Sequence, residues 1–320
     1  MPYKTRGKTS HSFKKVNMKT VKGFIEGFED FQHVTVTVSD IDKSMAFYRD
    51  LLGFPVLGRL NYHDESGLVI YFLDIGRNAL LEIFSFKVPV KPSEFIYDDH
   101  QRGLRHICFK VKDASATALR LKKAGVEFTL DPWDIPGGGK VAFFKSPDGV
   151  LLEILQFPVD TYINPNIIRE RLPVSIIPSG APGNSELTYE HTAMTVSNLD
   201  RALELYQGVL GFPVWEYTVE DSGSSIRVQI QVGNSNLELF SFGTSTIPHP
   251  WNPDSTVLGL KHIGLLVEDV DAVAGRLERA GVKILYPPVA ATGNVKTCFF
   301  ADPDGNGVEL IDGRCTYDRE

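Results

Sequence analysis

The chain has 320 residues, of which 42% are hydrophobic, 23% charged and 11% aromatic. This composition excludes a disordered or fibrous chain, and the length exceeds what one hydrophobic core usually supports, which favours two domains. The net charge of −7 disfavours a general nucleic-acid binder, and no apolar run approaches the roughly 18 residues of a membrane span. Three unpatterned cysteines indicate a reducing, cytoplasmic compartment.

The chain begins with a basic segment. Seven lysines and arginines precede the first acidic residue, Glu26, and no apolar stretch of a secretory signal follows them. We expect residues 1–30 to form a basic arm that is flexible or loosely docked. An organelle transit peptide is the alternative, and the single arginine in this segment, Arg6, disfavours it.

Four segments of the chain repeat one pattern, in which a valine follows a histidine by five residues and an aspartate or asparagine follows it by seven. The segments are His33–Asp40, His106–Asp113, His191–Asn198 and His262–Asp269. Each runs into a helical pattern that ends at a glycine: Gly53, Gly125, Gly211 and Gly281. The pattern predicts a strand, a helix capped by the aspartate or asparagine, and a glycine in the left-handed conformation after it.

Short β-patterned runs follow each helix, and the last run of every module carries a glutamate: Glu82, Glu153, Glu238 and Glu309. The glutamate follows its histidine by 49 residues in the first module and by 47 in the other three. The predicted fold class is therefore α+β, with a βαβββ unit copied four times. The predicted division is an arm (1–30), a first pair of modules (31–157), a linker (158–187) and a second pair (188–314).

The repeated histidines and glutamates call for a common explanation. Strand side chains alternate, so Val34, Val36 and Val38 should pack under the helix while His33 and Thr35 face a cavity. A glutamate in an apolar strand is costly to bury unless it is paired. Histidine–glutamate hydrogen bonds between strands would pair it. A divalent metal (Fe, Zn, Ni, Co or Mn) explains four such pairs better and leaves coordination positions open.

The chain resembles the vicinal oxygen chelate superfamily, the glyoxalase, bleomycin-resistance and extradiol-dioxygenase proteins. The motifs that carry the resemblance are His-x₄-Val-x-Asp, Phe47-Tyr48 with Leu52-Gly53-Phe54, Gly-Leu-x-His at 103–106 and 259–262, and Pro-Asp-Gly with Glu at 147–153 and 303–309. The resemblance covers 31–157 and 188–314. It implies that two modules form one curved mixed sheet of about eight strands, with helices outside and a metal in the cup.

The resemblance also implies the metal ligands, up to two metals per chain. They are His33, Glu82, His106, Glu153, His191, Glu238, His262 and Glu309. Neighbouring modules can pair, or the first can pair with the fourth and the second with the third. Either arrangement gives each centre two histidines and two glutamates. Four modules in one chain are compatible with a monomer and do not exclude a homodimer.

Two histidines with two glutamates resemble the glyoxalase and epimerase branch, which implies a metal-dependent lyase or isomerase. In that branch the metal chelates adjacent oxygens of a small carbonyl or hydroxyl substrate, and a glutamate moves the proton. The catalytic candidates are Glu153, Glu309, Glu82 and Glu238, which the sequence does not separate.

The alternatives are a non-haem Fe(II) ring-cleaving dioxygenase and a metal-free drug-binding protein. The first is disfavoured because Phe144 and Phe300 stand where that class carries a tyrosine, and the second because no ligand is lost. Arg227 and Tyr71, each 11 residues before a module glutamate, and Lys110 on the His106 face are candidates for substrate binding. Solvated or strand-edge positions explain these three equally well.

Overall fold

A computed structural model describes residues 26–135, 138–157, 186–219, 225–233, 235–243, 245–313, 315–316 and 318. Nearly all of the predicted arm (1–25) and of the predicted linker (158–185) lies outside the described residues. No helix in the described part of the chain is both long and apolar enough to cross a membrane.

Each module contains a strand, a helix and three further strands, as the repeat predicts. The first module comprises β1 (Phe28–Thr37), α1 (Ile41–Met45) with the π-helical turn η1 (Ala46–Leu51), β2 (Val56–Asn61), β3 (Val69–Gly76) and β4 (Ala79–Ser85). The second comprises β5 (Gly103–Lys110), α2 (Ala114–Lys123), β6 (Phe128–Ile135), β7 (Gly139–Lys145) and β8 (Leu151–Gln156).

The second half of the chain repeats these elements. The third module comprises β9 (Thr188–Val196), α3 (Leu199–Leu203) with η2 (Glu204–Val209), β10 (Val214–Val219), β11 (Ile226–Val232) and β12 (Ser235–Ser241). The fourth comprises β13 (Gly259–Val267), α4 (Val270–Arg279), β14 (Ile284–Ala291), β15 (Val295–Ala301) and β16 (Gly307–Asp312).

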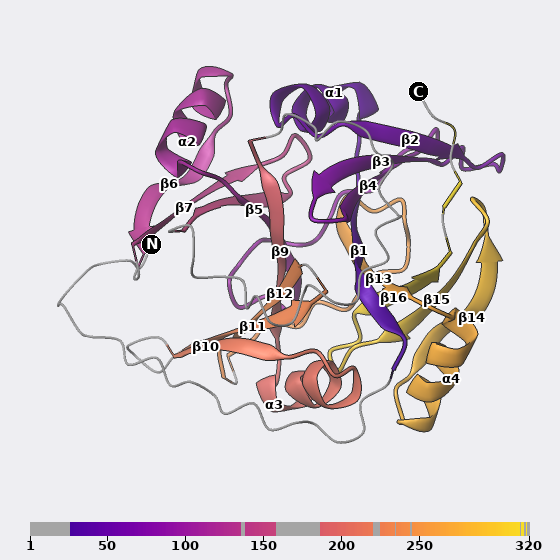
Figure 1. Cartoon of the computed structure of the whole chain (residues 1–320). Coiled ribbons are helices and arrows are strands. Elements are labelled where there is room, and N and C mark those ends of the chain that lie inside the picture. The colour runs from indigo at the N-terminus through magenta and orange to yellow at the C-terminus, as the bar shows by residue number, and fades with distance from the viewer. Residues whose placement is uncertain are drawn as a thin grey trace.

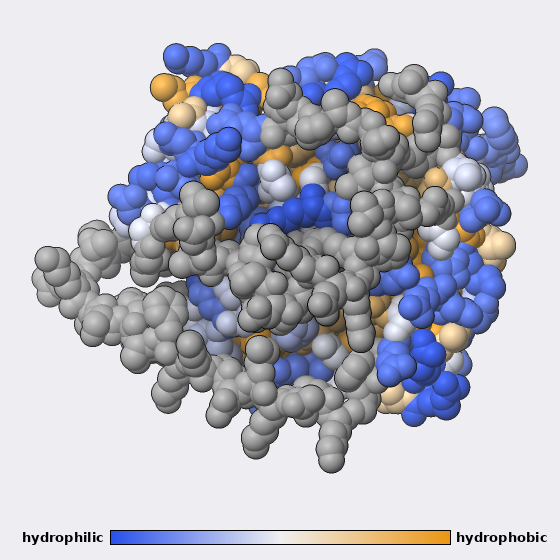
Figure 2. All heavy atoms as spheres, viewed as in Figure 1, coloured by the Kyte–Doolittle hydropathy of each residue, from blue (hydrophilic) through white to orange (hydrophobic). Residues whose placement is uncertain are grey.

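The modules pair crosswise rather than with their neighbours. One eight-stranded sheet has the order β14-β15-β16-β13-β1-β4-β3-β2, so it joins the first and fourth modules. The other has the order β10-β11-β12-β9-β5-β8-β7-β6 and joins the second and third. Figure 1 shows the two curved sheets with the helices on the outside, and Figure 2 shows that the outer surfaces of α1 and α4 are mostly hydrophilic.

Local signals in the sequence set the helix ends. Asp40, Asp113, Asn198 and Asp269 each cap a helix, because the side chain accepts a hydrogen bond from the backbone N–H three residues later. Such a cap typically contributes about 1 kcal/mol. All four glycines that follow the helices have positive φ, from 77° to 89°. The first and third helices differ from a plain α-helix because they finish in the π-helical turns η1 and η2.

One continuous hydrophobic core runs through all four modules. Val34, Val36 and Val38 belong to it, as the alternation of strand side chains predicts. The two sheets meet where Phe31 of β1 stacks on Tyr189 of β9, with ring centroids 5.0 Å apart. The strand orders place the first strands of the modules, β1, β5, β9 and β13, at the middle of the two sheets. These strands are mostly buried on both faces.

Candidate metal centres

Strand register brings the histidine and glutamate of a module together. In every module the first strand runs parallel to the last, and the residue two after the histidine lies opposite the glutamate. Thr35, for example, lies opposite Glu82. Because side chains two residues apart in a strand point to the same face, histidine and glutamate share the concave side of the sheet.

The first centre is formed by the first and fourth modules and contains His33, Glu82, His262 and Glu309. Ligand atoms of His33, His262 and Glu309 all lie within 4.8 Å of one another. Oε2 of Glu309 lies 3.1 Å from His33 Nε2 and 2.9 Å from His262 Nε2. All three side chains are buried.

Glu82 stands apart from this cluster of three. Its Oε2 accepts a hydrogen bond from Thr35 Oγ1 at 3.2 Å, and its Oε1 lies 3.5 Å from His33 Nδ1, the ring nitrogen that also contacts Gln32. Thr35 Oγ1 also lies 3.1 Å from His262 Nε2. The sequence identified Thr35 only as facing the cavity; its position between a glutamate and a histidine is a tertiary result.

The second centre is formed by the second and third modules. Ligand atoms of His106, Glu153, His191 and Glu238 all lie within 4.8 Å of one another. His106 Nε2 lies 2.9 Å from Glu153 Oε2, and His191 Nε2 lies 3.2 Å from Glu238 Oε2. The second centre therefore assembles all four predicted residues, whereas the first assembles three.

Further polar side chains hold the second centre in place. Gln229 Nε2 donates to Glu238 Oε1 at 2.6 Å, and Arg227 Nη1 donates to the same oxygen at 3.4 Å. Glu190 Oε2 lies 3.3 Å from His191 Nδ1. The sequence analysis identified neither Gln229 nor Glu190. For Glu190 a signal existed, because a polar residue precedes each of the four histidines: Gln32, Arg105, Glu190 and Lys261.

The three candidate substrate-binding residues are placed differently. Arg227 lies at the second centre, but Tyr71 packs against the hydrophobic core. Both residues precede their glutamate by 11 positions, but the β3–β4 hairpin has an irregularity near Gly76. Arg227 lies opposite Phe240, two residues from Glu238 and on the same face of the sheet. Tyr71 lies opposite Ile83, one residue from Glu82 and on the other face. Lys110 ends β5 four residues from His106, which separates their Cα atoms by about 13 Å.

Burial and the contacts between histidines and glutamates have opposite effects on the pKa values in the first centre. Burial alone would lower the pKa of His33, but the Glu82 and Glu309 carboxylates outweigh it and raise that pKa. Burial likewise opposes ionisation of Glu309, yet hydrogen bonds to His262 and His33 lower its pKa to about 2. Burial raises the pKa of Glu82, so the pKa values of these two carboxyls are shifted in opposite directions.

In the second centre the pKa values of the two carboxyls shift in the same direction, and those of the two histidines in opposite directions. Burial opposes ionisation of Glu153 and Glu238, but the neighbouring histidines hold the pKa of both carboxyls below the usual range. Burial lowers the pKa of His106, whereas for His191 nearby groups that include Cys108 and Glu238 outweigh burial and raise the pKa.

Both centres fit a divalent metal. Imidazole nitrogens and carboxylate oxygens are the ligands that Zn, Ni, Co, Mn and Fe accept, and here they converge in buried surroundings. His33 Nε2 and His262 Nε2 are both directed at the same oxygen of Glu309, at 3.1 and 2.9 Å, as expected of ligand atoms that would share one cation. His33, His262 and Glu309 would hold one metal, with Glu82 beside it, and the four residues of the second centre would hold another.

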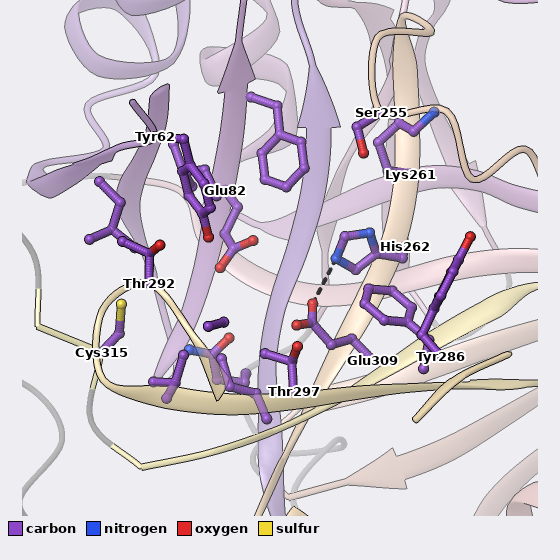
Figure 3. A pocket seen from close by; sticks show the side chains of 18 of the residues that line it. Tyr62, Glu82, Ser255, Lys261, His262, Tyr286, Thr292, Thr297, Glu309 and Cys315 are labelled. Atoms are coloured by element: carbon purple, nitrogen blue, oxygen red, sulfur yellow. Dashed lines mark hydrogen bonds and ion pairs between the residues drawn. The ribbon is translucent and has the colours of Figure 1, made fainter. Parts of the chain in front are cut away.

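A cavity of about 280 Å³ opens onto the first centre. Its lining includes Tyr62, Glu82, Lys261, His262, Thr297 and Glu309. Figure 3 shows Glu82 and Tyr62 on one side of the cavity and His262 on the other, with Glu309 between them. Residues near the C-terminus close one edge, because Cys315 lines the cavity and Asp318 pairs with Arg59 of β2. A small molecule can therefore reach the carboxylates and His262 of this centre.

Comparison with known proteins agrees with this architecture. The family model described as Glyoxalase/Bleomycin resistance protein/Dioxygenase superfamily matches residues 30–154 and 188–310. The chain is 27% identical over 315 residues to glyoxalase I of Saccharomyces cerevisiae, covering 87% of this chain and 91% of the yeast protein. Lactoylglutathione lyase GLX1 of Arabidopsis thaliana is 23% identical over 305 residues, covering 89% of this chain and 92% of the plant protein.

Shorter relatives and solved structures complete the comparison. Mitochondrial methylmalonyl-CoA epimerase of Mus musculus is 30% identical over 127 residues, which covers 39% of this chain and 71% of the epimerase. The structure of glyoxalase I from Zea mays matches with a TM-score of 0.65 and 21% identity, over 88% of this chain and 92% of the maize chain.

The chain belongs to the glyoxalase/bleomycin resistance protein/dioxygenase superfamily. Within it, the chain is a metal-dependent enzyme of the glyoxalase type that acts on a small oxygenated molecule.

Proposed function

We propose that the first centre is the catalytic site of an isomerising lyase that moves a proton between two adjacent oxygen-bearing carbons of its substrate. The placement of Glu82 carries this proposal. Its carboxylate lines the cavity, is held by Thr35 and lies outside the cluster of three ligands. A carboxylate beside a metal, rather than among its ligands, is free to exchange a proton with a bound molecule.

Each residue of the first centre then has a role. His33, His262 and Glu309 hold the metal, which when bound supplies a Lewis acid for the two adjacent substrate oxygens. Glu82 accepts the proton from the hydroxyl-bearing carbon and returns it to the neighbouring carbonyl carbon, while the hydroxyl proton passes to the former carbonyl oxygen, so the reaction needs no oxidant or reductant. Thr35 positions the Glu82 carboxylate through its hydroxyl.

We take the hemithioacetal of methylglyoxal and glutathione as the first substrate to test, because relatives that span most of the chain are named glyoxalase I and lactoylglutathione lyase. Methylmalonyl-CoA is the alternative to test, because one relative, 30% identical over 127 residues, is named methylmalonyl-CoA epimerase. In epimerisation the proton would return to the same carbon beside a carbonyl rather than to a neighbouring one. The identity of the metal, the cytoplasmic location and the boundaries of the two module pairs stay predictions.

The second centre is proposed to hold a second metal, with His106, Glu153, His191 and Glu238 as its ligands. Gln229 and Arg227 hold the Glu238 carboxylate at this cluster. Glu238 therefore serves as a ligand there, although its counterpart Glu82 serves as the base in the first centre. Each centre is complete within one chain, so the proposal does not require a partner subunit.

The test combines elemental analysis with turnover assays. We expect about two divalent metals per purified chain, one for each centre. The Glu82→Gln variant should keep both metals and lose about 100-fold or more in turnover, because general-base catalysis typically contributes 10²–10⁴-fold. The His262→Ala variant should lose one metal together with turnover, and Glu204→Gln, at an exposed helical glutamate, is the matched control.

Two outcomes would contradict the proposal. Full turnover in the Glu82→Gln variant would remove this residue from the reaction. Iron in the purified protein with oxygen consumption on a catechol would instead favour the dioxygenase alternative.

A further inference from the structure

Arg105 lies beside the second centre because of a β-bulge. Between Leu104 and His106, β5 contains one residue more than its partner strand β9. A bulge of this kind breaks the alternation of side chains and re-aims the extra residue. The guanidinium carbon of Arg105 consequently lies 4.4 Å from the ring centroid of Phe240, a ring 6.4 Å from the ring of His106.

Phe240 locates the guanidinium on the metal side of the sheet. Glu238 and Phe240 are two residues apart in β12, so their side chains point to the same face. Glu238 is a member of the second centre, and Arg105 covers the neighbouring ring. The guanidinium is therefore next to the cluster rather than on the outer, helix-covered face.

One nitrogen of this guanidinium has no hydrogen-bond partner in the described part of the chain. The side chain of Arg105 is only 10% exposed, and its Nη2 pairs with Asp99. Its Nη1 is buried without a hydrogen bond among the described residues. An unsatisfied buried hydrogen-bond donor costs free energy, and the cost is larger for a charged group than for a neutral one. We therefore expect Nη1 of Arg105 to face a ligand.

The equivalent position in the first centre is already satisfied. Lys261 precedes His262 as Arg105 precedes His106, but its Nζ donates to the backbone oxygens of Asp254 and Val257. Figure 3 shows its ammonium group pointing away from Glu309. The two centres thus differ in whether a cation is available for a bound molecule.

We propose that Arg105 forms a carboxylate subsite of the second centre, so that this centre takes a small metal-chelating molecule with a carboxylate at its other end. This inference rests on the proposed metal at the second centre. A carboxylate fits better than a phosphate, because Arg105 offers one free nitrogen and Glu153 and Glu238 already place negative charge nearby. The other cationic side chain at this centre, Arg227, is already paired with Glu216 and Glu238.

The experiment compares two hydroxamates of equal length on the Zn²⁺-loaded full chain. Hydroxamates present two adjacent oxygens to a metal, and succinate monohydroxamate differs from butyrohydroxamate by a terminal carboxylate. Glutarate and adipate monohydroxamates, each compared with its neutral counterpart, place the carboxylate one and two methylene groups farther from the hydroxamate. Calorimetric titrations are made in the His262→Ala background, which removes a ligand of the first centre and leaves the second as the binding site.

We expect the best carboxylate probe to bind at least about tenfold more tightly than its neutral counterpart, a difference of about 1.4 kcal/mol. Arg105→Leu should abolish this preference, Arg105→Lys should restore part of it, and Arg201→Leu, at an exposed helical arginine, should retain it. Circular dichroism verifies that each variant is folded, and Arg105→Gln replaces Arg105→Leu if the latter does not fold.

Different results would overturn different claims. If the neutral hydroxamates bind but no carboxylate improves affinity, or if Arg105→Leu keeps the preference, the carboxylate subsite is refuted while the metal centre stands. If no hydroxamate binds to the metal-loaded chain, the proposed metal chelation fails, and the subsite fails with it.

Discussion

Gly264 controls whether His33 can reach the first centre. It lies directly opposite His33 in the β1–β13 pair. A Cβ at this position would lie closer than 3.0 Å to three ring atoms of His33, a separation that real Cβ atoms essentially never show. His33 is only 1% exposed, so its ring cannot simply turn into solvent.

The size of the perturbation follows from these contacts. In the Gly264→Ala variant the nearest ring atom would lie 2.1 Å from the new Cβ, so it must retreat by at least about 1.3 Å to reach the 3.4 Å of ordinary van der Waals contact. Metal–ligand distances tolerate only about 0.2 Å, so we expect the first centre to lose its metal and the metal content to fall from about two per chain to about one. Overpacking should also lower the free energy of unfolding by about 1–3 kcal/mol.

Metal analysis, turnover and chemical unfolding measure these effects together. Gly275→Ala is the matched control, because this glycine lies within α4 and its added Cβ would meet only the end of the Arg279 side chain, at 3.4 Å. Cys108→Ala tests the equivalent position opposite His191, where a side chain is already accommodated. A Gly264→Ala protein with two metals, full turnover and unchanged stability would refute the steric argument.

Two further predictions concern stability and the rim of the cavity. Burial raises the pKa of Asp302 to about 6, above the roughly 3.9 of an unfolded chain, so this group stabilises the fold at low pH and loses that contribution as pH rises through about 4 to 6. The Asp302→Ser variant carries the residue that the second module has at the equivalent position, Ser146. In urea unfolding at a series of pH values, the free energy of unfolding of this variant should fall by up to about 3 kcal/mol less between pH 4 and 6 than that of the unmodified protein. The same pH profile for both proteins would contradict the raised pKa of Asp302. Asp318→Pro removes the N–H that donates to the Arg59 carbonyl, so the edge of the cavity should loosen and KM should rise several-fold with little change in melting temperature. Equal KM values for the two proteins would show that this edge does not shape the site.

The sequence predicted the modules well because their signals are local. Caps such as Asp40 and Asp269 act within one turn of the helix, and glycines such as Gly53 act at a single backbone position. The alternation of Val34 and Val36 with polar residues also needs only the geometry of one strand. These features do not depend on which module pairs with which.

The candidate substrate-binding residues were less predictable for a physical reason. Tyr71 and Arg227 have the same distance to their glutamates along the chain, yet one irregularity in a hairpin changes the face that a side chain occupies. The bulge that turns Arg105 toward the second centre is likewise a matter of strand register. Register depends on both strands of a pair, so spacing along one of them does not determine it.

By itself, the sequence determined four βαβββ modules, each with a histidine and a glutamate on one face of its sheet, because side-chain periodicity and capping are properties of short segments. Only the tertiary structure decided that the first module pairs with the fourth and the second with the third. It also decided that the two centres differ, with Glu82 beside one cluster and Glu238 within the other. Both results depend on contacts between residues that are far apart in the chain. The free energy of such contacts cannot be estimated from the sequence pattern of one short segment.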